Sequence, residues 1–332
     1  MRLQIYILIS ILQAFLQVFF QKLSIYAVKR DFFRNFVAKF RGLYLYNVKI
    51  PQIIVFGGVI VDLTLPVVMA IVNATPDSFY AGSRHVSADA LMLTVDKAVA
   101  DGAAILDVGG CSTRPGTAVP SAEEEWRRVS WALSLIRAKY PDFPISVDTF
   151  RASVAERAVV EFGVGMINDI SGGELDADLL PTMARLQVPY VLMHSKGTPQ
   201  TMQQLTDYDD LIPDMLRYFA DKIALLRRLG FDKEIVIDPG FGFAKTVEQN
   251  FELLRHLRVF GTFDLPVLAG ISRKSMLYKT LDVQPESALN GTTAANMLAL
   301  VGGASILRVH DVREAVETIK IYERTLVAGV KL

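Results

Sequence analysis

The 332-residue sequence predicts an α/β protein whose main domain is a closed (β/α)8 barrel of the TIM type. Three observations predict this fold. Eight short apolar runs are rich in Val and Ile and do not alternate with polar residues, as expected of parallel strands buried on both faces. Helical patterns lie between the runs. Most runs also end in polar residues, Gly or Pro, which are typical of the loops that form the active site of such barrels.

The expected elements follow in chain order. Two apolar segments, residues 53–56 and 59–63, flank Gly57-Gly58 and predict a β-hairpin that caps the N-terminal end of the barrel. The eight expected strands cover residues 67–72, 104–108, 144–147, 165–170, 189–193, 234–237, 266–271 and 305–309. Helices are expected between them, including residues 88–101, 123–139, 151–162, 211–229, 247–257 and 290–302.

An open, doubly wound sheet is the alternative arrangement of the same elements. Such sheets often carry a G-x-G-x-x-G loop after their first strand, and this sequence has none there. The closed barrel is therefore favoured. A barrel needs about 250 residues, which leaves room for an appendage in a chain of this length.

Composition and charge exclude several classes of function. The chain is 51% hydrophobic and 21% charged, and its 35 Lys+Arg balance 35 Asp+Glu. This balance argues against a broad nucleic-acid-binding surface, so no nucleic-acid partner is expected. Cys111 is the single cysteine, which rules out an intrachain disulfide framework and is typical of a reducing, cytoplasmic compartment. Neither CxxC nor HExxH occurs, so no zinc site is predicted.

Residues 1–48 form a hydrophobic and basic extension, and the barrel domain is predicted over residues 49–332. Residues 5–20 are nearly all apolar, but a membrane helix needs about 20 residues. No small-residue cleavage site follows, which argues against a cleaved signal peptide. Three interpretations stay open: a misassigned translation start, a disordered extension, and membrane contact through residues 3–23. Basic residues after the apolar stretch would then keep the barrel on the cytoplasmic face.

Seven short polar segments follow the predicted strands and predict one chemical site. Parallel strands of a barrel all end at the same face, so residues from different repeats converge there. The segments are NATPDSF (73–79), GGCSTRPG (109–116), SVDT (146–149), IND (167–169), IDPGFGF (237–243), ISRKS (271–275) and RVHD (308–311).

These motifs resemble those of the dihydropteroate synthases. The resemblance rests on NATPDSF, GGCSTRPG, SVDT, INDISGG, MHSKGTPQTMQ, DPGFGFAKT, SRKS and RVHDV, which occur here in the family's order and span about residues 53–325. One motif alone would be weak, whereas eight in order are specific. The resemblance implies a TIM barrel and a transferase of folate biosynthesis. That enzyme joins (7,8-dihydropterin-6-yl)methyl diphosphate to 4-aminobenzoate and releases diphosphate.

Carboxylate and amide side chains at three strand ends suit a pterin ring. A pterin is flat and has a hydrogen-bonding edge, and a site built to bind that edge discriminates strongly. By resemblance, Asp148, Asn168 and Asp238 hold the ring, with Met193 and Lys274 as further contacts. Asp148 would also stabilise positive charge on the ring. The alternative role of the Asp and Asn residues is helix capping or turn formation.

The departing diphosphate requires cations and hydrogen-bond donors. Arg308, His310 and Arg114 would converge on it, because a guanidinium binds phosphate through two parallel hydrogen bonds. By resemblance, Asn73 is the ligand of a Mg²⁺–diphosphate unit, and Mg²⁺ normally keeps waters and borrows substrate oxygens. The alternatives are a surface ion pair between Arg308 and Asp311 and an ordinary strand-end Asn73.

Two loops, residues 76–84 and 109–117, are expected to close over the 4-aminobenzoate and exclude water. By resemblance its pocket is formed by Asp77, Phe79, Thr113, Pro115, Ser272 and Lys274. Sulfonamides are expected as inhibitors at this pocket. Lys274 has two alternative roles, a solvated loop lysine and a Schiff-base lysine, but nothing in the sequence points to a carbonyl substrate.

The expected mechanism is dissociative substitution at the pterin methylene. Mg²⁺, Arg308, His310 and Arg114 stabilise the departing diphosphate, while the pterin-ring contacts stabilise the cation. Asp148 and Lys274 are the ring contacts expected to be catalytic. The aminobenzoate nitrogen then attacks. No general base is evident in the sequence, so positioning and electrostatics would supply most of the catalysis.

Three residues depart from the family pattern. Cys111 stands where GG-x-STRPG usually has Glu, Ala74 replaces a larger aliphatic residue, and Ser195 replaces a Met. Ala74 and Cys111 adjoin the two loops, so they are expected to affect loop packing or the response to sulfonamides. Cys111 as a nucleophile is the alternative to simple packing.

Two other classes of function stay open. One is a pterin-binding barrel that transfers a methyl group to a corrinoid protein, although it would not need the SRK, STRPG and RVHD set. The other is a non-catalytic, membrane-tethered pterin-binding protein, suggested only by residues 1–45. A homodimer is expected from the family, with the late helices as the interface.

Overall fold

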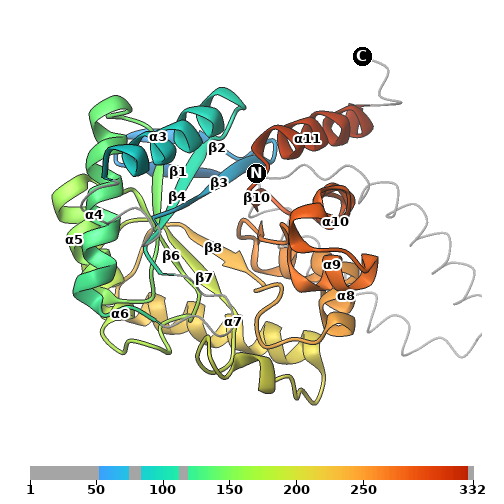
Figure 1. The fold of residues 1–332 in the computed structure, drawn as a ribbon. Coiled ribbons are helices and arrows are strands. Elements are labelled where there is room, and N and C mark those ends of the chain that lie inside the picture. The colour runs from blue at the N-terminus through green and yellow to red at the C-terminus, as the bar shows by residue number, and fades with distance from the viewer. Residues whose placement is uncertain (1–51, 75–83, 112–118, 328–332) are drawn as a thin grey trace, which may run out of the picture. The chain divides into compact units, whose positions relative to one another are not determined.

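The computed structural model describes residues 52–74, 84–111 and 119–327. Within them, parallel strands form one eight-stranded sheet in the order β8-β7-β6-β5-β4-β3-β10-β9 (Figure 1). The strands are β3 Val67–Asn73, β4 Ile105–Gly109, β5 Ile145–Asp148, β6 Met166–Asp169, β7 Tyr190–Met193, β8 Ile235–Asp238, β9 Leu268–Ala269 and β10 Ile306–Val309.

The two outer strands of this sheet meet, so the sheet closes on itself. Ile237 at the end of β8 bridges Val267 in the parallel sense, and the Ile237 backbone N–H donates to the Pro266 carbonyl at 2.9 Å. The predicted closed barrel is thereby confirmed, and the alternative of an open, doubly wound sheet is wrong. All eight strands lie where the sequence predicts them, with ends shifted by a few residues.

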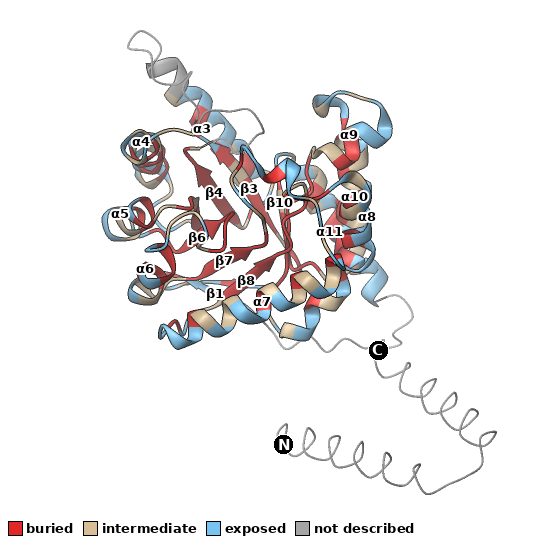
Figure 2. Ribbon diagram, turned by 90° about the horizontal axis from the view of Figure 1, so that it is seen from below, coloured by how far each residue is buried: buried red, intermediate tan, exposed pale blue. Residues whose placement is uncertain are grey.

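Helices surround the barrel, and their buried residues lie where they pack against the strands or against one another (Figure 2). They are α3 Arg84–Ala100, α4 Ala122–Lys139, α5 Ala152–Phe162, α6 Leu179–Leu186, α7 Leu211–Arg228, α8 Val247–Arg255, α9 Ser275–Leu281, α10 Leu289–Val301 and α11 Val312–Val327. Short 3₁₀ turns cover Met202–Gln204, Leu257–Phe263 and Pro285–Ser287. The six helices named from the sequence are confirmed. The helices α6, α9 and α11 are not among those six, and α6 and α9 have only about two turns, too few for a clear period.

The N-terminal hairpin covers the barrel end opposite the predicted site. Strands β1 Ile53–Phe56 and β2 Val59–Asp62 pair antiparallel. Their buried side chains form an apolar cluster with residues near the starts of the barrel strands: Ile54, Phe56, Val61, Leu63, Met69, Ile105, Met166, Val191, Val236, Leu268 and Ile306. A Cβ at Gly165 would lie 2.8 Å from Phe56 Cα, so glycine permits this close approach. The predicted hairpin cap is confirmed.

The predicted extension, residues 1–48, lies outside the described residues, so the domain boundary near residue 49 stays a prediction. In the part of the chain that the structure describes, no helix is both long and apolar enough to cross a membrane.

The C-terminal end of α9 offers a test of local strain. Asp282 caps this helix with a φ of 53°, a left-handed conformation that glycine adopts without cost. Its exposed carboxylate also faces the negative end of the helix dipole. We expect Asp282→Gly to raise the free energy of unfolding by about 0.5–1 kcal/mol in urea denaturation.

Asp282→Ala is the matched control, because it removes the charge but keeps the left-handed strain. An alanine variant that gains as much stability as the glycine variant would contradict the strain account. A glycine variant less stable than the parent would contradict it as well.

Candidate active site

Polar residues from neighbouring strands lie in one row at the C-terminal end of the barrel. Asn73 on β3 is paired in register with Gly109 on β4, and Gly109 with Asp148 on β5. Asp148 is paired in turn with Asn168 on β6. Neighbouring strands are about 4.8 Å apart, so this row brings three predicted site residues into one small region. The expectation that the motifs converge at one face is confirmed for these positions.

A buried carboxylate that the sequence analysis missed connects this row to β10. Asp107 on β4 has no exposed side-chain surface. Its Oδ2 accepts from Arg308 Nε at 2.6 Å and from Asn168 Nδ2 at 2.9 Å. Arg308 Nη2 also donates to Asp148 Oδ2 at 2.6 Å. One guanidinium therefore holds two carboxylates, and one carboxylate holds side chains from two other strands.

The Asp107 contact fixes the orientation of the Asn168 amide. The amide nitrogen can donate to a carboxylate, whereas the amide oxygen would be repelled by it. Asn168 therefore turns its Oδ1 away from Asp107, and that oxygen can accept a hydrogen bond from a ligand. A signal for Asp107 exists in the sequence, because it is an acidic residue inside the otherwise apolar run 104–108.

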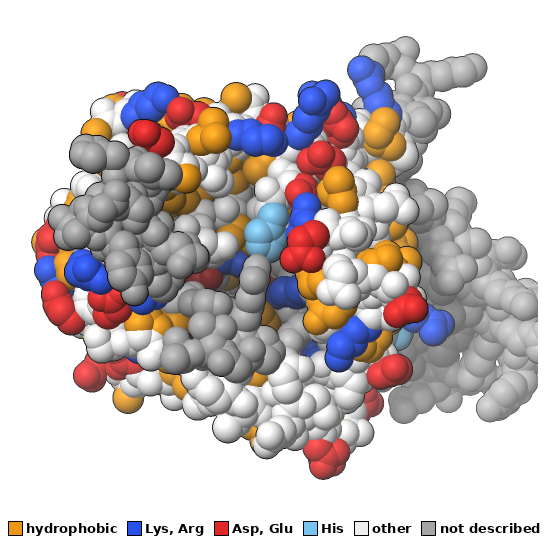
Figure 3. Space-filling view, in the orientation of Figure 1, with side chains coloured by type: hydrophobic (Ala, Val, Ile, Leu, Met, Phe, Trp, Pro, Cys, Tyr) orange, Lys and Arg blue, Asp and Glu red, His pale blue; other side chains and the backbone are white. Residues whose placement is uncertain are grey.

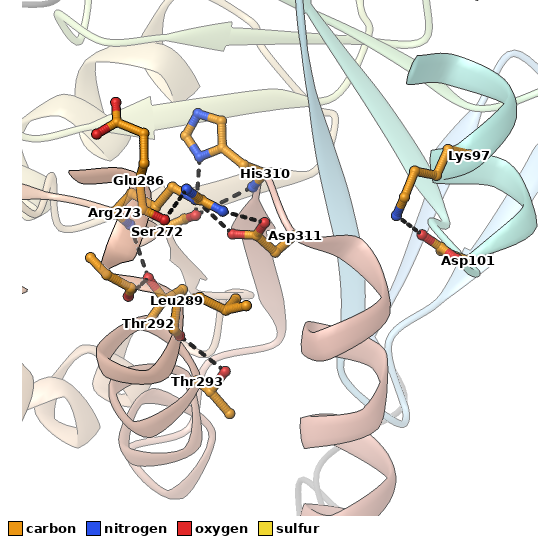
Figure 4. A network of polar contacts seen from close by, with 11 residues as sticks. Lys97, Asp101, Ser272, Arg273, Glu286, Leu289, Thr292, Thr293, His310 and Asp311 are labelled. Carbon is orange, nitrogen blue, oxygen red and sulfur yellow. Dashed lines mark hydrogen bonds and ion pairs between the residues drawn. The ribbon is translucent and has the colours of Figure 1, made fainter. Parts of the chain in front are cut away.

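Arg308 does not form the alternative pair with Asp311. That carboxylate binds Arg273 through two hydrogen bonds, from Nε at 2.9 Å and from Nη2 at 2.7 Å (Figure 4). The Arg273 backbone N–H donates to Thr292 Oγ1 at 3.0 Å, and Arg273 itself has a left-handed φ of 54°. These contacts fasten the loop after β9 to the loop after β10 and to α10.

The two joined loops also place two predicted site residues side by side. Ser272 Oγ lies 3.0 Å from His310 Nδ1 and accepts from the His310 backbone N–H at 3.3 Å (Figure 4). The serine hydroxyl accepts from that N–H and can at the same time donate its hydrogen to Nδ1. A neutral His310 would then carry its proton on Nε2, which suits it to donate to an anion.

Lys274 is held against the loop that follows β8. Its Nζ donates to the Phe241 carbonyl and lies 4.7 Å from the centre of the Phe243 ring. A Cβ at Gly242 would lie 3.0 Å from Lys274 Cδ, so the glycine makes room for the lysine stem. These contacts do not support the alternative of a solvated loop lysine.

Burial and neighbouring charges shift the protonation of the site. Burial raises the pKa of Asp148 to about 7, against the opposing effect of Arg308. Burial also raises the pKa of Asp238, against the effect of Lys274. Burial lowers the pKa of Lys274 to about 8, while Asp238 opposes that shift. Perturbed acids and bases that meet at strand ends are typical of functional sites.

An apolar group completes the site. Phe150, Ile170 and Met193 are buried together at the C-terminal end of the barrel, and Phe243 packs beside them. Met193 is paired in register with Asp238, so the apolar surface adjoins a carboxylate. In the space-filling view, basic side chains and a histidine gather in and beside a hollow (Figure 3). The arrangement suits a flat ring with a polar edge that carries an anionic group.

Some predicted residues cannot be placed. Asp77, Phe79, Thr113, Arg114 and Pro115 lie in residues 75–83 and 112–118, outside the described residues, so their roles stay predictions.

Two of the three departures from the family pattern, Ala74 and Cys111, lie next to these segments. Ala74 is buried, and its N–H donates to the Gly109 carbonyl at 2.9 Å. Cys111 is half-buried, and burial together with Glu125 raises the pKa of its thiol to about 11. The thiol therefore stays protonated near neutral pH, which argues against Cys111 as a nucleophile.

A comparison with known proteins shows which proteins this chain resembles. Residues 69–310 match the family described as "Pterin binding enzyme". The chain is 43% identical over 256 residues to a dihydropteroate synthase of Synechocystis sp., a match that covers 76% of this chain and 88% of that protein.

Solved structures agree. A dihydropteroate synthase of Yersinia pestis in complex with a sulfonamide drug is similar at a TM-score of 0.78 and 38% identity, covering 83% of this chain and 100% of that one. The dihydropteroate synthase of Xanthomonas albilineans with 4-aminobenzoic acid is similar at a TM-score of 0.77 and 38% identity, covering 85% of this chain and 100% of that one.

Proposed function

The chain belongs to the pterin-binding enzyme family and, within it, to the dihydropteroate synthases, and we propose how its residues perform that reaction. The chain condenses (7,8-dihydropterin-6-yl)methyl diphosphate with 4-aminobenzoate to give 7,8-dihydropteroate and diphosphate, in folate biosynthesis. The observation that carries the residue assignment is the cluster in which Arg308 joins Asp107 and Asp148, because it pairs ring-binding groups with a cation for the leaving group.

The pterin ring is proposed to bind between the polar row and the apolar group. Asp238 and the oriented Asn168 oxygen accept from N–H groups of the ring, and Lys274 donates to the ring carbonyl. Met193 contacts the ring face. Hydrogen bonds to buried groups of fixed orientation discriminate strongly against rings that lack the matching edge.

Diphosphate release is proposed to depend on Arg308, His310 and Arg114. The C–O bond between the pterin methylene and the diphosphate breaks, and its electron pair leaves with the diphosphate oxygen. The ring becomes cationic, and the carboxylate of Asp148 stabilises it. The aminobenzoate nitrogen then forms the new C–N bond and loses a proton to water or to diphosphate. Preorganised charges of this kind are the usual source of such rate enhancement.

The donors present fit a Mg²⁺ ion that is bound together with substrate. Asn73 is exposed at the strand end and offers an amide oxygen, a suitable ligand for this cation. Among the described residues, no three His, Cys, Asp or Glu side chains are grouped to hold a metal by themselves. We propose that Asn73 contributes one ligand and diphosphate oxygens contribute others. When bound, the ion would neutralise charge on the leaving group.

We also propose an inhibitor class, an oligomeric state and a cellular location. Sulfonamide inhibition is supported by the drug complex of the Yersinia pestis relative.

A homodimer through the late helices is supported by four apolar side chains that are between 50% and 61% exposed: Leu298, Val301, Ile321 and Leu326. The single cysteine is typical of a reducing compartment, which supports a cytoplasmic location. We propose that residues 1–48 are an appendage outside the catalytic domain. If they contact a membrane, the basic residues after the apolar stretch would keep the barrel on the cytoplasmic face.

The protonation of Lys274 predicts a pH dependence. Burial lowers its pKa to about 8, and only the ammonium form gives the ring carbonyl a charge-assisted hydrogen bond, which is stronger than one from the neutral amine. We therefore expect kcat/KM to fall about tenfold per pH unit as pH rises beyond that value. Lys274→Arg keeps its charge in this range, so its profile should lack the alkaline decrease even if its activity is lower. An alkaline decrease at the same pH in both proteins would contradict this assignment.

Turnover separates the proposed function from its alternatives. Product formation from pterin-methyl diphosphate and 4-aminobenzoate should require Mg²⁺ and should weaken in Asn73→Ala at limiting Mg²⁺. A corrinoid-dependent methyltransferase or a pterin-binding protein would bind the pterin without making dihydropteroate. Pterin binding without turnover would therefore overturn the proposal.

A further inference from the structure

The loop that follows β8 is held by side chains at each of six successive carbonyls, those of residues 240–245. The donors to these carbonyls, in chain order of the acceptor, are Lys245 Nζ, Lys274 Nζ, Gln203 Nε2, Lys245 Nζ, Tyr208 Oη and Asn250 Nδ2. The loop lacks regular strand or helix pairing, so its carbonyls depend mainly on side-chain donors, although the Gly240 carbonyl also accepts from the Phe243 N–H at 3.1 Å. Three of its residues, Gly240, Gly242 and Ala244, have φ values of 71°, 80° and 47°.

Lys245 is the residue in this set that binds twice. Its side chain is buried, at 3% exposure. Nζ lies 3.0 Å from both the Gly240 and Phe243 carbonyls and 3.2 Å from His194 Nδ1. An ammonium has three hydrogens, and it has three acceptors here. Burying a lysine without partners would be costly, so this arrangement is specific.

The third partner ties the loop to a different strand. His194 directly follows β7, and its backbone N–H donates to the Asp238 carbonyl at 3.0 Å. Its ring is packed against Tyr218, with ring centres 4.9 Å apart. Lys245 therefore braces the loop after β8 against His194, the residue that directly follows β7.

The braced segment begins next to one group of the active site and carries the acceptor of another. Asp238 lies at one end, and its Oδ1 accepts from the Gly240 N–H at 2.8 Å. The Phe241 carbonyl, which receives Lys274, lies between the two carbonyls that Lys245 holds. Movement at Gly240 or Phe243 would displace both Asp238 and the acceptor of Lys274.

We propose that Lys245 is a positioning residue that sets the loop of residues 239–245 and thereby orients Asp238 and Lys274 toward the pterin. The inference rests on the proposed function, because it names a further residue for pterin binding. Lys245 is too deeply placed to be a catalytic group itself. Its effect is expected on the pterin side of the reaction rather than on 4-aminobenzoate.

The brace holds in either protonation state of the lysine. Burial lowers the pKa of Lys245 to about 7, while Asp238 opposes that shift. Burial also holds the pKa of His194 well below its usual range, and the positive charges of Lys245 and Lys196 add to that effect. A neutral amine would still donate to the two carbonyls and would accept from a His194 Nδ1–H. The positioning role therefore predicts no pH dependence of its own.

Steady-state kinetics of the full chain with Lys245→Met test this role, since methionine has a similar length and no donor. We expect the KM for pterin-methyl diphosphate to rise about 10- to 100-fold, while the KM for 4-aminobenzoate changes by less than about threefold. A residue needed only for folding would lower kcat with the active fraction and leave both KM values unchanged. That outcome, or an unchanged pterin KM, overturns the proposal.

Tyr208→Phe is the matched control, because it removes one donor to the same loop and leaves Lys245 in place. Its pterin KM should change less than about threefold. If Lys245→Met does not fold, His194→Leu takes its place, with an expected rise in pterin KM of about three- to tenfold. An unchanged value there overturns the proposal. An inactive wild-type chain would instead refute the proposed function.

Discussion

Replacing Arg308 with alanine is expected to lower kcat/KM by about 10³-fold or more. Two effects combine. The departing diphosphate loses a cation, and two carboxylates lose their shared partner, since Asp107 is fully buried and Asp148 is 13% exposed. Leaving buried charges unpaired also costs stability, here about 3 kcal/mol. Steady-state turnover and urea denaturation measure the two effects separately.

Two further variants test the geometry of this arginine. Arg308→Lys keeps the charge but cannot reach both carboxylates with a planar fork, so its activity should lie between those of wild type and Arg308→Ala. Arg313→Ala is the surface control, because this exposed arginine pairs only with the exposed Glu317 among the described residues. An Arg308→Ala variant that keeps activity within about tenfold of wild type would contradict the assignment.

Replacing Asp107 with alanine is expected to lower kcat/KM by about 10²-fold, mainly through pterin binding. The Asn168 amide would lose the partner that fixes its orientation, and Arg308 would lose its Nε acceptor. Asp107→Asn keeps an acceptor of the same shape without the charge, so its loss should be smaller. KM values for both substrates, with circular dichroism to check folding, separate these cases.

The control for Asp107 is a carboxylate of the same type outside the site. Asp101→Asn removes a carboxylate that pairs with the exposed Lys97 at the end of α3 (Figure 4). Surface pairs of this kind contribute little, so its kinetics should match wild type. Equal effects of Asp101→Asn and Asp107→Ala would mean that the site assignment of Asp107 is wrong.

The sequence predicts the convergence of Asp148, Asn168 and Asp238 because strand order and polarity suffice for it. Parallel strands end at one face, and each of these residues stands at the end of an apolar run. The same reasoning explains why Ser272 and His310 are found together, since β9 and β10 are neighbours in the barrel. The ends of strands are less certain. Only Leu268–Ala269 of the run 266–271 pairs as a strand, because residues 270–271 already lead into the loop of Ser272.

The sequence does not indicate which side chains these site residues contact. Arg308 binds Asp107, which is 201 positions away, and Asp148, which is 160 positions away, so no local pattern indicates either contact. Asp107 lies within β4 rather than after it, so the pattern of polar residues at strand ends does not indicate it. Lys245 was missed because a lysine in a Gly-rich loop is usually solvated. Its burial depends on three acceptors that only the folded chain brings together.

The most direct test of the central claim is the stoichiometry of products from the full chain. Pterin-methyl diphosphate, 4-aminobenzoate and Mg²⁺ should give diphosphate and dihydropteroate in equal amounts, with both lost together in Lys274→Ala and Arg308→Ala. Equal loss is expected because one cluster of residues binds the ring and stabilises the leaving group. Folded wild-type protein that binds the pterin but forms neither product would contradict the account.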